Sequence, residues 1–464
     1  MHVSPLSSRR QFLQRTLAFG SALTAGRAWG AADSLRMAAF RFDVTPPVGH
    51  PLAGGWIMPM VDCVDELEAV GLVITGCGRP IVLCVVDWVG IMNDAHAAWT
   101  SALAQAAGTT TDRVAVHCVH QHDAPFVCLH AQRIAEEFKT ELNVMDVSFF
   151  EDCLTRAGRA VAEGLAKARP LTHVAHGEGR VEKVASNRRV AVGADGRLEV
   201  RRMRGSSCTT PDLIAMPEGL IDPILKTVAF YDGTEKIAAC HYYATHPMSM
   251  YGKGHVSSDF PGLARKQRQK DEPRCAHLYF TGCGGNIAAG KYNDGSAEAR
   301  DGLIQRVYEG IVASEKALIP RPVESVTWQS CEFLPEINPA FKMDELRSMV
   351  ANSANAPVNR LRPAIRIAWM QRILDRKPMI LSALNLNDAT LLHLPGEPFV
   401  EFQLRLQQAY PERFIATAAY GDGGPWYIPT KEAWPVGGYE VTVAHVAQSA
   451  DESLTNGVQQ CLVS

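Results

Sequence analysis

Two histidines, His120 and His122, have the residue type and spacing needed for metal chemistry. They follow an apolar run containing Val114 and Val116, which predicts a buried strand. Because alternate side chains of a strand share a face, His120 and His122 are expected to point the same way and His117 the other way. Two imidazoles on one face can ligate a zinc ion. A polar turn with hydrogen-bonded histidines is the alternative.

Other polar residues stand where further predicted strands end: His246, Gly284-Gly285-Asn286, Glu397 and Tyr427. In α/β sheets, ligand sites gather outside the carboxyl ends of the strands. Together with the first two histidines, these residues supply the donors of a zinc site made from imidazole, carboxylate and phenol. Singly, His246 could cap a strand, Glu397 could stabilise a first helical turn, and Tyr427 could be a surface aromatic. The glycine-rich stretch 282–286 could cradle an anion or form a structural turn.

The order of predicted elements indicates an α/β fold with mixed β-sheets, flanking helices and an active site in the strand-end loops. Residues 33–464 are expected to form one catalytic domain with a helical insertion around 339–377. Helices are expected over 95–107, 149–168, 297–317 and after Phe399. Strands are expected over 37–43, 67–74, 80–89, 225–231, 236–243, 277–280, 379–394 and 414–420.

Composition limits the class of protein. The chain has 464 residues, of which 47% are hydrophobic and 20% charged, as in a globular protein with a sizeable core. A formal charge of −3 offers no electrostatic footprint for nucleic acid, so no such partner is expected. No apolar run reaches membrane-spanning length, so no transmembrane segment is expected in the mature chain. The twelve cysteines include no Cys-x-x-Cys pair, which argues against a thiolate zinc knuckle.

Residues 1–32 have the layout of a cleaved export signal. The pair Arg9-Arg10 precedes an apolar segment at 17–25 and small residues at 28–31. The paired arginines indicate the twin-arginine (Tat) route, so the Tat translocase is an expected partner and the mature protein is expected to be periplasmic or secreted. A plain amphipathic start is the alternative. Export would permit disulfides, but their connectivity does not follow from the sequence.

Nine short motifs, spread over nearly the whole mature chain, resemble the catalytic domain of the neutral/alkaline non-lysosomal ceramidase family. The segment His120–Pro125 stands where that family has Thr-His-Thr-His-Ser-x-Pro. The resemblance implies a divergent bacterial member with a zinc cofactor. In family order, the motifs are Asp43–Gly49, His120–Pro125, Asn187–Arg188, Ala244–His246, Ser258–Gly262, Gly285–Asn286, Pro395–Glu397, Tyr427–Glu432 and Gly438–Glu440.

By position, the resemblance implies four zinc ligands: His120, His246, Glu397 and Tyr427. Arg188 and Tyr439 match residues that contact the substrate or the developing oxyanion. The proton acceptor is left open between His122, which would lie beside the zinc, Asp123 and Asp259. These roles are chemically consistent, because zinc lowers the pKa of a bound water to about 7 and polarises a carbonyl. A phenol and a guanidinium stabilise charge on the oxygen.

The sequence departs from the family pattern in two places. The family's proposed nucleophilic serine lies two positions after the site matched by Asn286, and that position here is Ala288. We therefore expect attack by metal-activated water rather than by a serine. The chain ends soon after the Tyr439 motif, so the family's C-terminal immunoglobulin-like domain is expected to be absent. Both departures indicate divergence from the family, so the resemblance does not identify ceramide as the substrate.

These observations predict an exported zinc-dependent hydrolase of the neutral ceramidase superfamily, with a role in lipid metabolism. It would cleave an amide (N-acyl) or related carbonyl bond in a small-molecule or lipid substrate. Two alternatives remain: a zinc-dependent ester or phosphoester hydrolase, and a zinc-bearing binding protein without turnover.

Overall fold

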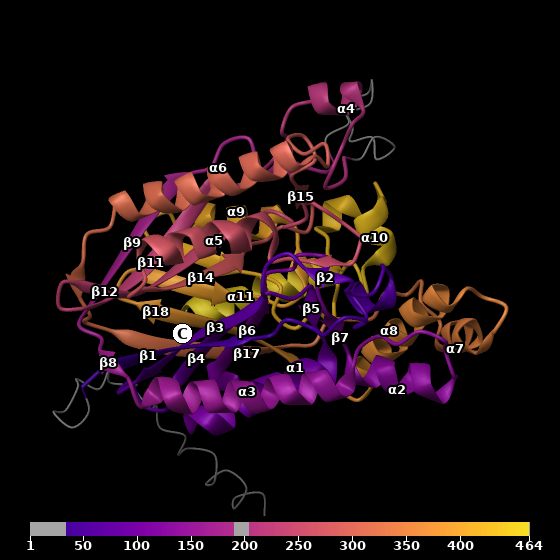
Figure 1. Ribbon diagram of the computed structural model, residues 1–464, viewed down its shortest axis with the longest axis horizontal. Helices are drawn as coiled ribbons and strands as arrows, with labels where there is room; N and C mark the ends of the chain where they lie inside the picture. The colour runs from indigo at the N-terminus through magenta and orange to yellow at the C-terminus, as the bar shows by residue number, and fades with distance from the viewer. Residues whose placement is uncertain (1–33, 190–203, 464) are drawn as a thin grey trace, which may run out of the picture. The chain divides into compact units, whose positions relative to one another are not determined.

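Three β-sheets built on one repeated strand order organise the chain, which a computed structural model describes over residues 34–189 and 204–463 (Figure 1). In each sheet an antiparallel hairpin is followed by a helix and then by a strand parallel to the second hairpin strand. The first unit is β3 (Glu68–Thr75), β4 (Ile81–Val86), α1 (Asn93–Ala107) and β6 (Val114–Cys118). The second is β11 (Ile224–Asp232), β12 (Glu235–Tyr243), α5 (Asp259–Asp271) and β14 (Ala276–Thr281). The third is β18 (Met379–Leu386), β19 (Ala389–His393), α9 (Val400–Ala409) and β21 (Phe414–Ala418).

Further elements extend and cover these units. The sheets run β6-β4-β3-β1-β8, β14-β12-β11-β9-β16 and β17-β18-β19-β21. The added strands are β1 (Arg36–Asp43), β8 (Arg169–Pro170), β9 (His173–Arg180), β16 (Arg321–Pro322) and β17 (Val326–Phe333). Two-residue strands pair as β2 (Asp62–Cys63) with β13 (His255–Val256), β5 (Gly90–Ile91) with β7 (Phe126–Val127), β10 (Ser186–Asn187) with β15 (Ile287–Ala288), and β20 (Glu397–Pro398) with β22 (Tyr427–Ile428).

The remaining helices are α2 (Leu129–Glu137), α3 (Val147–Leu165), α4 (Pro211–Ala215), α6 (Ala297–Lys316), α7 (Met343–Ala351), α8 (Pro357–Leu374), α10 (Tyr439–Val443) and α11 (Ala450–Val463), with short 3-10 turns at Ala53–Gly55, Thr111–Arg113 and Lys431–Ala433. The two long helices α3 and α6 begin at side-chain caps. Asp146 accepts a hydrogen bond from the Phe149 amide, and Ser296 accepts one from the Ala299 amide. The prediction of mixed sheets with flanking helices is confirmed.

Each sheet is covered by helices on one face, and its other face contributes to a shared core. Helices α1 and α3 pack on the first sheet, α5 and α6 on the second, and α11 on the third (Figure 1). Alternation along β3 sends Ala69 and Val73 to the helix-side core and Leu72 to a second core. That second core also contains Val228 from the second sheet and Leu391 from the third. Burial on both faces explains why β3 and β4 are apolar almost throughout.

The last strands of the three units, β6, β14 and β21, are joined to one another by hydrogen bonds near their carboxyl ends. The Cys118 amide, at the end of β6, donates to the Tyr420 carbonyl at 2.8 Å, and the Ala419 amide donates to the Thr281 carbonyl at 2.8 Å. The Thr281 hydroxyl, at the end of β14, donates to the Val119 carbonyl at 2.7 Å. Since all three sheets meet here, the loops that follow their strands are directed into one region.

Two predictions on domain organisation stay predictions. The expected export signal, residues 1–32, lies outside the described residues. The interpretation of 339–377 as an insertion also stays a prediction. This stretch contains helices α7 and α8. Helix α8 begins with a proline in its first turn, where the missing N–H of proline costs no helical hydrogen bond. Residues from Leu35 onward form one compact unit. Of the helices in the described part of the chain, none combines the length and apolar character needed to cross a bilayer.

Buried histidines outside the strand-end loops should make the fold sensitive to acid. His117 on β6 is buried, and its Nδ1 lies 2.6 Å from the Ala419 carbonyl. Burial lowers the pKa of His117 to about 4, from an ordinary value of 6.5 that the unfolded chain retains. As pH falls below 6.5, only the unfolded chain binds this proton, so the free energy of unfolding decreases until about pH 4. Between pH 7 and pH 5.5 the expected loss is about 1 kcal/mol.

Urea unfolding of the wild type and of His117→Asn at both pH values measures this effect. The asparagine retains an N–H for the Ala419 carbonyl but does not titrate. The wild type should therefore lose about 1 kcal/mol more than the variant. Equal losses in the two proteins would contradict the assignment of His117 as neutral and buried.

Candidate metal centre

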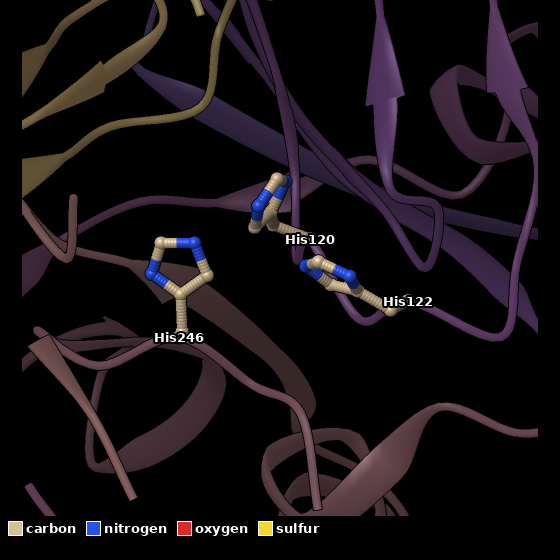
Figure 2. A group of neighbouring side chains, drawn as sticks. All are labelled: His120, His122 and His246. Atoms are coloured by element: carbon tan, nitrogen blue, oxygen red, sulfur yellow. The ribbon is translucent and has the colours of Figure 1, made fainter. Parts of the chain in front are cut away.

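Three histidines meet beyond the joined strand ends: His120, His122 and His246 (Figure 2). Each offers a ring nitrogen, and these nitrogens all lie within 4.8 Å of one another. The ring of His120 lies 5.0 Å from that of His122 and 4.9 Å from that of His246, between centroids. Glu397 Oε2 lies 3.5 Å from His120 Nε2 and 3.2 Å from His246 Nε2. The first sheet thus contributes His120, the second His246 and the third Glu397.

Backbone carbonyls orient the two histidines that face the carboxylate. His120 Nδ1 lies 2.7 Å from the Val89 carbonyl, and His246 Nδ1 lies 2.6 Å from the Gly284 carbonyl. A carbonyl only accepts, so each Nδ1 carries the proton and each Nε2 presents a lone pair toward Glu397. A histidine that ligates a metal through one nitrogen usually donates its other N–H in this way.

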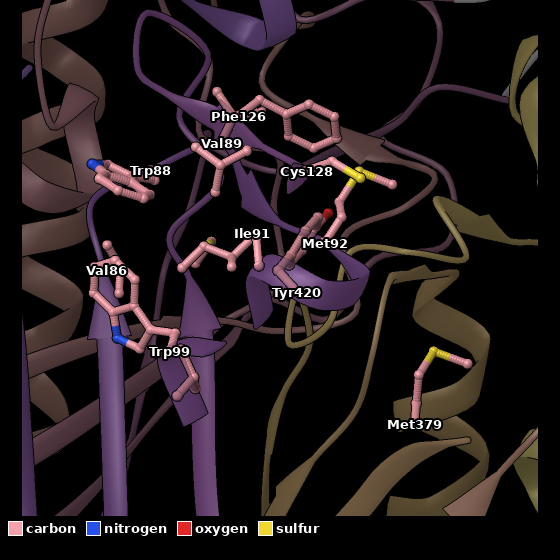
Figure 3. Close-up of a cluster of buried hydrophobic side chains, with 14 of the residues drawn as sticks. Val86, Trp88, Val89, Ile91, Met92, Trp99, Phe126, Cys128, Met379 and Tyr420 are labelled. Carbon is pink, nitrogen blue, oxygen red and sulfur yellow. The ribbon is translucent and has the colours of Figure 1, made fainter. Parts of the chain in front are cut away.

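The sequence-based reason for the pairing of His120 with His122 is wrong. Strand β6 ends at Cys118, so alternation along a strand does not apply to them. His120 instead has a φ of 77°, in the left-handed region that non-glycine residues rarely adopt. Its amide donates to the Trp88 carbonyl at 2.9 Å, and its ring stacks on Tyr420 with centroids 4.3 Å apart. An apolar cluster that includes Trp88 and Tyr420 supports this strained turn (Figure 3).

Tyr427 is brought to the cluster by a short strand pair. In the parallel pairing of β20 with β22, Tyr427 lies opposite Glu397. Its Oη lies 3.4 Å from His246 Nε2, and Arg188 Nη1 donates to the same oxygen at 3.2 Å. Gly285 packs against the backbone of β20, where an added Cβ would be 2.3 Å from the Glu397 carbonyl oxygen. Glycine at this position therefore allows the loop and β20 to approach.

Charge in the site matches what a divalent cation requires. Burial lowers the pKa of His122 and of His246, which keeps these imidazoles neutral. Burial opposes ionisation of Glu397, whereas positive charge at His120 and His246 lowers its pKa below the ordinary value. A cation bound between the two imidazoles would act in the same direction and keep the carboxylate ionised. Burial and the adjacent Glu397 raise the pKa of the Tyr427 phenol.

The cluster also contains buried polar atoms without hydrogen-bond partners, which a bound cation would satisfy. Within the described residues, Glu397 Oε2 and His122 Nε2 are buried and have no hydrogen-bond partner, which is uncommon for buried polar atoms. With protons on both Nδ1 atoms, the Nε2 lone pairs of His120 and His246 face Glu397 Oε2 as acceptor against acceptor. A cation between them removes this conflict. Imidazole nitrogens with a carboxylate oxygen form a donor set that suits zinc.

A buried carboxylate holds two adjacent arginines at the edge of the cluster. Glu440 is fully buried, with Oε1 3.4 Å from Arg188 Nε and Oε2 3.1 Å from Arg189 Nη1. Burial opposes the charge on Arg188, but Tyr427 and Glu440 raise its pKa and keep it a cation. Tyr439 is 39% exposed, and the Arg188 Cζ lies 5.9 Å from its ring centroid. Tyr439 therefore lies on the solvent side of Arg188.

Of the three candidate proton acceptors, the two aspartates are occupied elsewhere. Asp259 accepts a hydrogen bond from the Ser249 amide at 2.9 Å and another from the Ser249 hydroxyl. Asp123 accepts one from the Gly252 amide at 3.0 Å. No hydrogen bond or ion pair within the described residues links either aspartate to the three histidines. Of the three candidate acceptors, His122 is the one that lies in the histidine cluster.

The glycine-rich stretch 282–286 forms a structural turn. The amides of Gly282, Cys283 and Gly285 donate to the Tyr243 carbonyl, Gln403 Oε1 and the Pro398 carbonyl at 2.9, 2.8 and 3.0 Å. These N–H groups are therefore not available to cradle an anion. Ala288 follows on β15, fully buried, opposite Ser186 and in a parallel bridge with His246. The residue at the family's serine position thus lies beside a candidate metal ligand.

Several groups of the site were not identified from sequence. The carbonyls of Val89 and Gly284 carry no residue-type signal, because any residue provides a carbonyl. The Tyr420 ring lies at the end of an apolar strand, where it resembles a core residue. Glu440 was noted only as part of a motif, although a buried acid was to be expected near the adjacent arginines Arg188 and Arg189.

Two other groups of possible ligands differ electrostatically from this cluster: His241, His277 and Glu315, and Glu272, Cys275 and His277. In both, a lysine neutralises the carboxylate, because Lys236 Nζ lies 2.8 Å from Glu315 and 2.7 Å from Glu272. An ammonium already paired with the carboxylates opposes a second cation. The group with His120 is therefore the better candidate.

Comparison with known proteins supports the fold. No protein-family model matches this chain, and no curated protein does either. Among solved structures, a ceramidase complexed with C2 aligns with a TM-score of 0.65 and 15% identity, covering 91% of this chain and 74% of that one. The crystal structure of neutral ceramidase from Pseudomonas aeruginosa aligns with a TM-score of 0.62 and 15% identity, covering 92% and 73%. The chain therefore has a ceramidase-like fold.

Removal of single ligands tests the metal centre. His246→Ala and Glu397→Ala should each abolish stoichiometric zinc uptake, because each removes one of the four assigned donors. Metal content of the purified proteins after zinc loading and desalting is the measurement. His130→Ala, which alters a half-buried histidine on α2, is the matched control and should bind zinc as the wild type does. Full zinc uptake by either ligand variant would contradict the assigned donor set.

Proposed function

We propose that this protein is a zinc-dependent hydrolase that cleaves an amide (N-acyl) or related carbonyl bond by attack of water. The observation that carries the proposal is the convergence of His120, His246 and Glu397, one from each sheet, with the unpaired Glu397 Oε2 facing both Nε2 atoms. The ceramidase-like fold is consistent with amide hydrolysis.

The zinc would be held by His120, His246 and Glu397, with Tyr427 as the fourth ligand. When bound, zinc lowers the pKa of a water to about 7 and polarises a carbonyl. Arg188 remains charged and donates to Tyr427 Oη, so it is positioned to stabilise negative charge developing on the substrate oxygen. Tyr439 lies beyond Arg188, where its phenol would contact the substrate.

Proton transfer is assigned to His122. Its imidazole is neutral, and its Nε2 is free to accept a proton from the attacking water. The same nitrogen can then return the proton to the leaving amine, as general acid–base catalysis requires. Ala288 has no nucleophilic atom, which supports a water mechanism over an acyl-serine mechanism.

The substrate class and location are proposed on separate grounds. A small-molecule or lipid amide is supported by the ceramidases whose fold the chain shares. Export through the Tat translocase to the periplasm or the exterior is supported by the Arg9-Arg10 pair and the apolar segment after it. Phosphoester hydrolysis has less support, because the amides of Gly282, Cys283 and Gly285 in the 282–286 turn donate to groups within the protein.

Hydrolytic activity should depend on the metal. We expect the zinc-loaded protein to hydrolyse a short-chain fluorescent ceramide or another N-acyl amide, to lose this activity on chelation, and to regain it with zinc. Matched esters and phosphate esters assayed in parallel identify the bond that is cleaved. Stoichiometric zinc with no chelator-sensitive cleavage of any substrate would favour a binding protein without turnover and contradict the proposal.

A His122 variant separates proton transfer from metal binding. His122→Ala should retain zinc but reduce kcat by roughly 10²–10⁴-fold, the usual contribution of a general base. Zinc content and steady-state kinetics on the same preparation give both quantities. Loss of zinc from His122→Ala would instead make His122 a ligand and contradict its assignment as the proton acceptor.

A further inference from the structure

The C-terminal helix and an edge strand each place a cysteine at the same point. Helix α11 packs on strands β17 and β18 of the third sheet. Cys461 on α11 is buried, Cys331 on β17 is partly exposed, and their Sγ atoms lie 3.0 Å apart. That separation is about 1 Å longer than a disulfide bond. The pair is separated by 130 positions in sequence.

Local packing fixes the two sulfurs in this position. Gly457 lies one helical turn before Cys461, and an added Cβ there would be 2.6 Å from Leu381 Cδ1. Glycine therefore lets α11 approach the sheet closely. Cys331 lies opposite Leu381 in the β17–β18 ladder, and its Sγ donates to the Gly457 carbonyl at 3.1 Å. Both ends of the pair are thus held by backbone rather than by flexible side chains.

We propose that Cys331 and Cys461 form a disulfide when the protein meets an oxidising thiol–disulfide couple. The Cys331 thiolate, which is the more exposed, attacks the disulfide of the oxidant and releases one thiol. The Cys461 thiolate then attacks the mixed disulfide and releases the second thiol. The two cysteines lose two protons and two electrons, and the oxidant is reduced to two thiols.

The cross-link would tie the last helix of the chain to β17. By closing a long loop, it restricts the unfolded chain and raises stability. Neither cysteine contacts the histidine cluster in the described structure, so the proposal does not depend on the proposed hydrolase function. It does complement the proposed export, because disulfides form and persist outside the cytoplasm.

Thiol mapping of the full chain tests the proposal. The purified reduced protein is incubated with glutathione disulfide, alkylated, digested without reductant and examined by mass spectrometry. We expect a cross-linked peptide pair containing Cys331 and Cys461, and two fewer alkylated cysteines than in the reduced protein. The oxidised protein should also have a Tm higher by roughly 2–5 °C, a gain that dithiothreitol reverses.

Two serine variants serve as controls. Cys331→Ser should lose both the peptide pair and the Tm gain, whereas Cys77→Ser, which alters a partly buried cysteine elsewhere, should keep both. Recovery of Cys331 and Cys461 as separately alkylated or glutathionylated residues in the oxidised wild type would overturn the proposal. So would a disulfide that joins either of them to a different cysteine. Because the wild type is tested in both redox states, the result does not depend on the folding of a variant.

Discussion

The hydrogen bonds that join the ends of β6, β14 and β21 are the constraint on which the candidate site depends. They connect residues far apart in sequence, such as Cys118 with Tyr420 and Thr281 with Ala419. Each bond is made where a parallel strand ends, so the loop beyond it begins at a fixed point. Each sheet supplies one of the three groups His120, His246 and Glu397. Any shift of one sheet relative to the others would therefore separate the imidazole nitrogens from the carboxylate.

Several residues at the site have strained backbone conformations, and packing of the surrounding core offsets their free-energy cost. His120, Tyr420 and Trp426 all have positive φ, in a region of the map that non-glycine residues rarely occupy. Each such residue costs on the order of 1–3 kcal/mol and persists only where packing determines it. Here the packing comes from an apolar cluster that includes Trp88, Val89 and Tyr420 (Figure 3). Backbone strain of this kind is often found at functional sites.

Many helices and strands were predictable, because local residue patterns in the sequence indicate them. Apolar runs bounded by turns predicted β3, β4, β11, β12 and β14, and long helical segments predicted α3 and α6. The repeated unit was not visible, because hairpin, helix and parallel strand recur in topology without recurring in sequence. The meeting of the three sheets depends on hydrogen bonds between distant residues, which leave no local trace.

The sequence predicted which residues belong to the candidate site better than it predicted how they are arranged. Position after a strand selected His120, His246, Glu397 and Tyr427, and the structure brings all four together. The prediction did not foresee the left-handed turn at His120. It also grouped Asp259 with the site, although its carboxylate is engaged by Ser249. Residue type indicates what a side chain can do, whereas its hydrogen-bond partners decide whether it is available.

Anomalous scattering at the zinc edge, from crystals of the zinc-loaded protein, would locate the metal directly. We expect one strong peak at about 2.0–2.2 Å from His120 Nε2, His246 Nε2 and a Glu397 oxygen, the usual zinc–ligand distances. A peak at His241, His277 and Glu315, or at Cys275 and Glu272, with none at His120, would contradict it. That result would place the metal away from the junction of the three sheets and remove the basis for the proposed hydrolysis.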